Sequence, residues 1–305
     1  MSRRRIAIIG SGAVGCYYGA KLAAGGEDVH FLMRRDFEHV KAHGLLIKSI
    51  AENDIHLKRV ACYDSTEDIG PCDWVIIAIK ATSNAVLENL LPPLLNERTA
   101  LILLQNGLGA EELLADLFGA ERVLGGLCFV CLNRTAPGVI EHYGEGAIAL
   151  AEHHGAPQER TREICAKFQR CGILCEIKEN LAETRWKKLL WNVPFNGLSI
   201  AAGGITVDHI LADAGLARLA RQLMLELIEA AKNEGIKIPL ATVDALIEKT
   251  LHMGAYRPSS LIDYLERRPV EVEAIWGEPY RRGLKSGATV PQLEMLYYLL
   301  KYLTP

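Results

Sequence analysis

A glycine-rich stretch near the start of the sequence has the spacing of a dinucleotide-binding turn. Gly10, Gly12 and Gly15 form G-x-G-x-x-G directly after the apolar run Ile6–Ile9, which is typical of a buried strand, and a helix is expected next. These glycines would allow a tight turn, a close approach of a pyrophosphate, and close packing of helix on strand. Free N–H groups at the helix start would bind the phosphates. The residues expected to bind the cofactor here are Gly10, Ser11, Gly12, Ala13, Val14 and Gly15.

An arginine follows the second predicted strand, where NAD-binding sequences usually have an acidic residue. This strand is expected over Glu27–Met33 and ends in Arg34 and Arg35. An acidic side chain at this place binds the ribose 2′-hydroxyl of NAD, whereas a guanidinium can bind a 2′-phosphate through two hydrogen bonds. Arg34 therefore favours NADPH and NADP+ over NAD. The alternative is a solvated arginine pair in a loop.

Three polar residues recur at every fourth position of a later, otherwise apolar helical stretch. Lys188, Asn192 and Asn196 would share one helix face at about 100° per residue. Buried asparagines need partners, and asparagine is a poor helix former, so this face is predicted to line a site rather than to be a solvated stripe. Pro194 is expected to break or kink the helix.

Lys188 is the residue of this face that could act as an acid. A lysine with an ordinary pKa of about 10.4 is protonated at neutral pH. It could donate a proton to a ketone oxygen as a hydride reaches the carbon. The amides of Asn192 and Asn196 could orient the lysine, the cofactor or the substrate.

The first half of the chain predicts a doubly wound α/β sheet, which would position these residues. Buried strands are expected at Cys72–Ile79 and Thr99–Leu104, with a helix after each. Ligands of such sheets bind beyond the carboxyl ends of the strands. Lys80 and Asn106 lie at two such ends and are assigned to the cofactor site, although each could be only a loop residue.

The segment from 123 to 179 is expected to add antiparallel strands to the parallel sheet. Val139–Tyr143 and Ala147–Leu150 are predicted to form a hairpin that turns at Gly144–Gly146. A helix over Gln158–Cys171 and one more strand would complete the domain.

From residue 180 onward the apolar periodicity is helical. Beyond the helix that contains Lys188, the candidate helices are 206–234, 239–252, 260–267, 270–286 and 291–303. We therefore predict a Rossmann-like NADP-binding domain over residues 1–179 and an all-α substrate and dimerisation domain over residues 180–305.

Composition argues against several other classes of protein. The net charge of −3 gives no general attraction to nucleic acid or anionic membranes, and no apolar run has the length of a membrane span. The arginines at the N-terminus precede a strand rather than a signal-peptide core. Cys128-x2-Cys131 and Cys171-x3-Cys175 have zinc-like spacing, but their apolar neighbours favour buried thiols. We expect a cytoplasmic protein with reduced cysteines and no bound metal.

Taken together, these residues resemble the ketopantoate reductase (2-dehydropantoate 2-reductase) family over essentially the whole chain. The glycine motif, Arg34, Lys80 and Asn106 match family positions, as does the Lys-x3-Asn-x3-Asn pattern. Within 256–263 the substrate-binding serine of the family matches Ser259, and its substrate-binding glutamate matches Glu271. The resemblance implies NADPH-dependent reduction of 2-dehydropantoate to pantoate in pantothenate and coenzyme A biosynthesis, with the lysine of the pattern as the catalytic acid. Because apolar helices of such domains often pair, a homodimer is also expected.

Three positions depart from the family pattern and leave the substrate open. Tyr256, Ile262 and Trp276 stand where the family commonly has Asn, Gln and Asn. A related 2-oxo acid therefore remains an alternative substrate, and a β-hydroxyacid dehydrogenase remains an alternative class. A cofactor-binding sensor without turnover is disfavoured by Lys188. Ser259 could also serve only as a helix N-cap.

Overall fold

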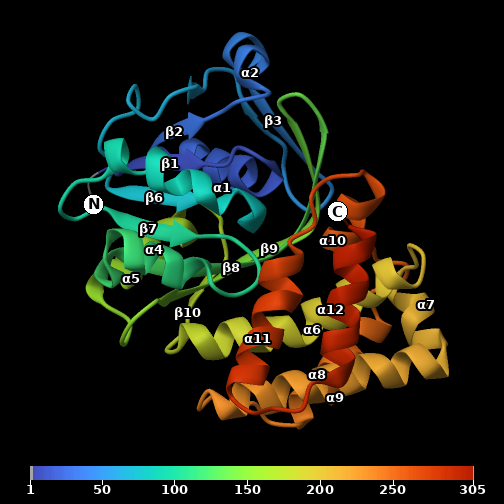
Figure 1. Cartoon of the computed structure of the whole chain (residues 1–305). Coiled ribbons are helices and arrows are strands. Elements are labelled where there is room, and N and C mark those ends of the chain that lie inside the picture. Colours follow the sequence, from blue (N-terminus) through green and yellow to red (C-terminus); the bar gives the residue numbers. More distant parts are fainter. Residues whose placement is uncertain (1–2, 305) are drawn as a thin grey trace. The chain divides into compact units, whose positions relative to one another are not determined.

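The computed structural model describes residues 3–304, which form two compact units (Figure 1). The first unit contains the chain up to Gln105 together with Ala110–Leu181, and the second contains Asn106–Gly109 together with the chain from Ala182. The sequence predicted a single boundary, between residues 179 and 180. It did not predict that residues 106–109 belong to the second unit. No helix within the described residues is long and apolar enough to span a membrane.

The first unit is built on a mixed sheet of ten strands. The strands are β1 (Arg5–Ile9), β2 (Asp28–Leu32), β3 (Leu45–Ser49), β4 (Ile55–Leu57), β5 (Ala61–Tyr63), β6 (Trp74–Ile77), β7 (Ala100–Leu103), β8 (Val123–Ala136), β9 (Val139–Glu152) and β10 (Cys175–Ile177). Their order is β4-β3-β9-β8-β7-β6-β1-β2-β5, with β10 beside β9. Strands β5, β2, β1, β6, β7 and β8 pair in parallel, which confirms the predicted doubly wound α/β fold.

Both faces of the parallel strands are buried, as their continuous apolar runs require. In β1, Ile6 and Ile8 point into one apolar cluster, and Ala7 and Ile9 into another. The first cluster includes residues of helices α1 (Ala13–Ala24) and α5 (Glu159–Arg170). The second includes residues of α3 (Leu87–Leu90) and α4 (Ala110–Phe118). The remaining helix of this unit, α2 (Phe37–His43), follows β2.

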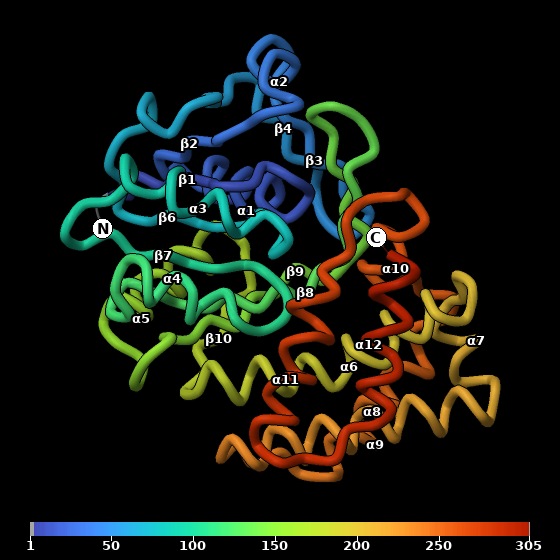
Figure 2. Tube along the Cα trace, viewed as in Figure 1, coloured from blue at the N-terminus to red at the C-terminus, as the bar shows by residue number. Residues whose placement is uncertain are grey.

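The antiparallel strands form one long hairpin, whose turn is not at the predicted place. β8 and β9 are joined at Pro137-Gly138, the tip of the green hairpin in Figure 2, and Gly138 has a φ of 66°. The predicted turn, Gly144–Gly146, lies inside β9, where Glu145 and Gly144 pair with Val130 and Cys131 and the register shifts on both sides. The two short strands predicted around it are therefore one bulged strand.

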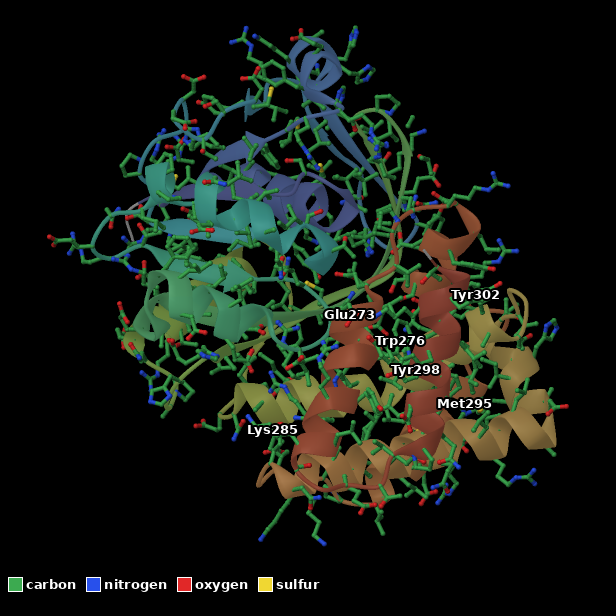
Figure 3. The ribbon with its side chains drawn as sticks, in the orientation of Figure 1. Glu273, Trp276, Lys285, Met295, Tyr298 and Tyr302 are labelled. Carbon is green, nitrogen blue, oxygen red and sulfur yellow. The ribbon has the colours of Figure 1, made fainter. Side chains whose placement is uncertain are left out.

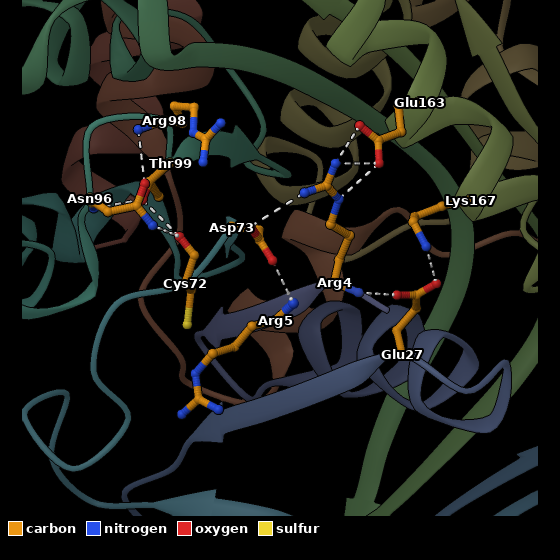
Figure 4. Close-up of polar contacts among 10 residues, drawn as sticks. All are labelled: Arg4, Arg5, Glu27, Cys72, Asp73, Asn96, Arg98, Thr99, Glu163 and Lys167. Atoms are coloured by element: carbon orange, nitrogen blue, oxygen red, sulfur yellow. Dashed lines mark hydrogen bonds and ion pairs between the residues drawn. The ribbon is translucent and has the colours of Figure 1, made fainter. Parts of the chain in front are cut away.

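Charged residues hold together the amino-terminal edge of the sheet, opposite to the glycine turn. The Arg4 guanidinium donates to both carboxylate oxygens of Glu163 at 2.8 Å (Figure 4). Lys167 is 2% exposed, and its ammonium donates to Glu27 at 2.6 Å. Since these partners lie far apart in sequence, they tie α5 to the starts of β1 and β2.

The second unit consists of helices, drawn from yellow to red in Figure 1. They are α6 (Leu181–Ala201), α7 (Val207–Ala212), α8 (Ala214–Asn233), α9 (Ala241–Leu251), α10 (Ser259–Leu265), a π-helical turn (Glu273–Gly277), α11 (Glu278–Lys285) and α12 (Pro291–Leu303). The all-α prediction is confirmed, with two differences. The predicted helix 206–234 is divided because Asp213 caps the Leu216 N–H at 2.8 Å, and α6 continues through Pro194 instead of ending there.

Candidate functional site

The three glycines of the first turn have different surroundings. Gly10 has a φ of 103° and lies against the backbone of Ile79, where a side chain would overlap the main chain. A side chain at Gly15 would overlap the Gly10 carbonyl oxygen. At Gly12, in contrast, no atom of the described residues other than its neighbours along the chain lies within 4 Å of the place a Cβ would take. Gly10 and Gly15 thus allow close packing, whereas Gly12 leaves the backbone open to an approaching group.

The amino terminus of α1 is suited to an anion. Its N-cap is Gly12, which has no side chain to bond the free N–H groups, and the first turn contains no acidic residue. Ser11 donates its hydroxyl to the Leu32 carbonyl oxygen at 2.7 Å, which ties the turn to the end of β2. The half-buried Ala13 and Val14 start the helix. Free N–H groups and the positive end of the helix dipole fit a pyrophosphate.

Arg34 lies just beyond β2 with an exposed side chain. The nearest acidic residue in sequence, Asp36, is engaged elsewhere, because both of its carboxylate oxygens accept from Arg134 at 2.6 Å. Within the described part of the chain, no carboxylate lies at ion-pair distance from Arg34. Its guanidinium is therefore available to an added anion.

Lys80 and Asn106, predicted together at strand ends, belong to different units. Lys80 is exposed and precedes a short 3-10 helix, Ala81–Val86. Asn106 begins the segment assigned to the helical unit. Between them in sequence lies a residue that was not predicted to belong to the site. Gln105 donates to the Ile79 carbonyl at 2.8 Å and to Asn84 at 2.6 Å, so it joins the ends of β6 and β7.

The segment Asn106–Gly109 is bound to the π-helical turn of the second unit. The Leu108 N–H donates to the Ala274 carbonyl oxygen at 3.0 Å. Gly107 has a φ of 87° and lies so close to Ala274 that a side chain there would overlap it. The second unit therefore contains Asn106 together with the other predicted residues Lys188, Asn192, Asn196, Ser259 and Glu271.

The polar face of α6 is largely buried. Lys188 is half-buried, while Asn192 and Asn196 are 8% and 1% exposed. Asn196 uses both ends of its amide, because Nδ2 donates to the Asn192 carbonyl at 3.0 Å and Oδ1 accepts from the Ser260 N–H at 2.9 Å. The side chain of Asn196 therefore fixes the start of α10.

Ser259 opens α10 with an exposed side chain. The cap of this helix comes from Asn196 on α6, and the Ser259 hydroxyl makes no hydrogen bond within residues 3–304. Asp263, three residues after Ser260, is 4% exposed and pairs with Arg268 at 2.9 Å. The interpretation of Ser259 as a simple cap is therefore not what the structure shows.

Glu271 and the three positions that depart from the family pattern differ in burial. Glu271 is 4% exposed and lies just before the π-helical turn. Trp276 is fully buried, and its indole N–H donates to the Val193 carbonyl at 2.9 Å, so it is a core residue. Tyr256 and Ile262 are half-buried.

The cysteines provide neither disulfides nor a metal site in the described part of the chain. None of the eight forms a disulfide, and no group of three or more His, Cys, Asp and Glu side chains there is arranged to bind a metal. Burial raises the pKa of the Cys16 thiol to about 12, which keeps it protonated and unreactive at neutral pH.

Comparison with known families covers nearly the entire chain. Residues 6–155 match the family model Ketopantoate reductase PanE/ApbA, and residues 180–304 match the model of its C-terminal part. The chain belongs to the ketopantoate reductase family. This confirms the resemblance inferred from the motifs, and with it the class of enzyme, a reductase.

Individual ketopantoate reductases match over their full lengths. A 2-dehydropantoate 2-reductase of Nostoc sp. is 42% identical, over 99% of this chain and 96% of the relative. The crystal structure of a 2-dehydropantoate 2-reductase from Geobacter metallireducens has a TM-score of 0.96 at 44% identity, and covers 98% of this chain and 100% of that one. A ketopantoate reductase from Staphylococcus aureus, described as dimeric, is 25% identical with a TM-score of 0.80, over 98% of each chain.

Proposed function

We propose that this protein reduces 2-dehydropantoate to pantoate with NADPH, a step in pantothenate and coenzyme A biosynthesis. The observation that supports it most directly is the full-length similarity to reductases named for this reaction, at 42% and 44% identity. The helical unit adds chemical support, since it contains an ammonium, amides, a hydroxyl and a carboxylate at the positions that the motifs predict.

The residues of the first unit fit the proposed cofactor. The open approach at Gly12 and the uncapped start of α1 suit its pyrophosphate. Arg34, exposed and without an acidic partner in the described chain, suits the 2′-phosphate that distinguishes NADPH from NADH. We assign Lys80 and Asn106 to cofactor binding as well. When bound, the nicotinamide supplies a hydride to the carbonyl carbon of the substrate.

The residues of the second unit would bind the 2-oxo acid and donate the proton for its reduction. The Lys188 ammonium donates a proton from Nζ to the carbonyl oxygen as negative charge develops there. Asn192 orients this oxygen or the lysine, and Asn196 keeps the polar face in place. The Ser259 hydroxyl can donate to a substrate carboxylate, and Glu271 can accept from a substrate hydroxyl.

A substrate panel tests this proposal. The purified protein is supplied with NADPH and with 2-dehydropantoate, its analogue without the hydroxyl, and an aromatic 2-oxo acid. NADPH oxidation is followed by absorbance, and the product is identified by mass spectrometry. We expect the highest kcat/KM with 2-dehydropantoate. A higher value with the aromatic acid would overturn the substrate assignment, and preference for NADH would overturn that of the cofactor.

We further propose that the protein is a homodimer. α12 exposes an apolar stripe at helical spacing, in which Met295, Tyr298 and Tyr302 are 53%, 55% and 85% exposed (Figure 3). The relative from Staphylococcus aureus is described as dimeric. Light scattering after size-exclusion chromatography should give twice the chain mass, and Tyr298→Lys with Tyr302→Lys should give the monomer. A monomeric unsubstituted protein would contradict the proposal.

A further inference from the structure

The π-helical turn Glu273–Gly277 contacts two separate pieces of the second unit that contain proposed site residues, and it begins two residues after a third such residue, Glu271. We propose that Trp276, in this turn, is a positioning residue for the reduction: with the carbonyl of Ala274 it holds the segment of Asn106 and helix α6 in register with Glu271. This inference rests on the proposed function and gives a role to Trp276, a position at which the sequence departs from the family pattern.

The turn has a cause in the sequence. The Glu278 N–H donates to the Glu273 carbonyl, five residues back, instead of to Ala274, four residues back. The next residue, Pro279, has no N–H to donate. The Ala274 carbonyl is thereby left without a donor from its own helix, and this half-buried residue can accept a hydrogen bond from elsewhere.

The first connection satisfies this carbonyl. Leu108 donates its N–H to Ala274 at 3.0 Å, two residues after Asn106. The approach is possible because Gly107 has no side chain and adopts a φ of 87°. The position of Asn106 thus depends on the altered register of the turn.

The second connection is made by the indole of Trp276. Its N–H donates to the Val193 carbonyl at 2.9 Å, one residue after Asn192 on the helix that also contains Lys188. Gly197 lies against the indole, where a side chain would crowd both the ring nitrogen and Leu296. The distance between α6 and the turn is therefore set by one ring and one hydrogen bond.

The third connection fixes the turn itself, two residues after Glu271. Glu273, labelled with Trp276 in Figure 3, accepts from Arg281 at 2.7 Å and from the Tyr297 hydroxyl at 2.8 Å. Lys301 adds an ion pair at 3.4 Å. These contacts join the start of the turn to both α11 and α12, two residues after Glu271.

A second buried tryptophan, Trp186 on α6, provides a matched control for Trp276. Trp186 is also 0% exposed, and its indole N–H donates at 3.2 Å to Glu234, at the end of α8. That helix contains none of the proposed site residues. Replacing Trp186 by Phe removes a buried indole hydrogen bond of similar length without touching the π-helical turn.

The test compares Trp276→Phe and Trp186→Phe with the unsubstituted protein. We expect both to lower Tm by a similar amount. Only Trp276→Phe should lower kcat for 2-dehydropantoate, by about 10- to 100-fold, since small displacements of reacting groups have effects of this size. The Kd for NADPH, measured by fluorescence titration, should rise far less than kcat falls, because the glycine turn and Arg34 are unchanged and Asn106 is the one proposed cofactor residue that the turn positions. Gly107→Ala disturbs the same turn at its contact with Ala274 and should also lower kcat. This variant tests the proposal if Trp276→Phe fails to fold.

Equal losses of kcat in the two tryptophan variants, or an unchanged kcat in Trp276→Phe, would overturn the positioning role. The unsubstituted protein, assayed in parallel, separates this result from failure of the proposed function. Absence of 2-dehydropantoate turnover by the unsubstituted protein overturns the function and the inference with it. Normal turnover with an unaffected Trp276→Phe overturns only the inference.

Discussion

The side-chain oxygen of Asn196 accepts the backbone N–H of Ser260 at 2.9 Å, so a residue of α6 caps helix α10. The same amide donates to the Asn192 carbonyl at 3.0 Å. One side chain thus links the helix of the proposed acid to the helix of Ser259. Asn196, expected from its spacing to orient the lysine, the cofactor or the substrate, has its amide engaged within the protein.

We expect Asn196→Ala to lower the free energy of unfolding by about 1–3 kcal/mol, because the buried Ser260 N–H loses its acceptor. The KM for the 2-oxo acid should rise as α10 loosens. Urea unfolding and initial rates measure the two effects. Asn233→Ala is the control, since Asn233 is exposed and bonds the Ser286 carbonyl at 3.2 Å. Equal destabilisation by both changes would contradict the assigned cap.

Arg34→Ala should weaken NADPH about 10- to 100-fold, because charge-assisted hydrogen bonds contribute about 1.5–3 kcal/mol. NADH lacks the 2′-phosphate, so its Kd should change little. Fluorescence titration with both cofactors measures the difference, and Arg35→Ala serves as the neighbouring control. If the substitution weakened both cofactors equally, Arg34 would not be the residue that recognises the phosphate.

Lys188→Ala should lower kcat by about 10²–10⁴-fold, the usual contribution of a positioned acid, with NADPH binding retained. Lys187→Ala is the control, because Lys187 is turned about 100° away and pairs with Glu183 at 2.5 Å. Both variants are compared at saturating substrate. Loss of activity only in Lys187→Ala would show that the helix face is misassigned by one residue, and full activity in both would assign the proton to another donor.

Ser259→Ala and Glu271→Gln should bind NADPH normally while losing most of kcat/KM for the 2-oxo acid. The reason is that both residues are assigned to the substrate alone, and neither change alters the glycine turn or Arg34. Fluorescence titration and steady-state kinetics separate the two properties. A collapse of cofactor affinity would move these residues to the cofactor site, and unchanged kinetics would remove them from the site altogether.

Glu52 in the first unit should make stability depend on pH. Burial raises the pKa of its carboxyl, but hydrogen bonds from Lys21 at 2.5 Å and Tyr17 at 2.8 Å outweigh burial, so the pKa lies below its usual value. A lowered pKa in the folded state stabilises the protein above the unfolded value of about 4.3, and this contribution is lost as pH falls through the folded pKa. Glu52→Gln should therefore destabilise the protein at pH 7, and urea midpoints of the two proteins should converge in acid. A difference between the two urea midpoints that grows as the pH falls would contradict this prediction.

The features that the sequence predicted well depend on neighbours along the chain. The strand, glycine turn and helix around Gly12 follow from a few consecutive residues. The shared face of Lys188 and Asn192 follows from helical geometry alone. Such local patterns also sufficed for the doubly wound sheet and for the all-α second unit, because apolar periodicity decides which faces are buried.

The features that the sequence did not predict depend on contacts between residues far apart in the chain. Two turn signals, Pro137-Gly138 and Gly144–Gly146, compete in the hairpin, and only the pairing of β8 with β9 decides between them. Trp276 departs from the family pattern in sequence, but only the structure shows that its indole is buried and donates to the Val193 carbonyl. The acceptor of the Ser260 N–H lies on another helix, which no local pattern reveals.

The excursion of Asn106–Gly109 determines when the protein can finish folding. Ribosomes make this segment early, yet Leu108, 7% exposed in the folded protein, belongs to the core of helices made much later. Its partner Ala274 is synthesised much later than Leu108. Until then Leu108 is an apolar residue without the helices that cover it in the folded protein. The two units are therefore not separable by a single cut, and a truncated chain ending at residue 181 would retain a fragment of the other unit's interior.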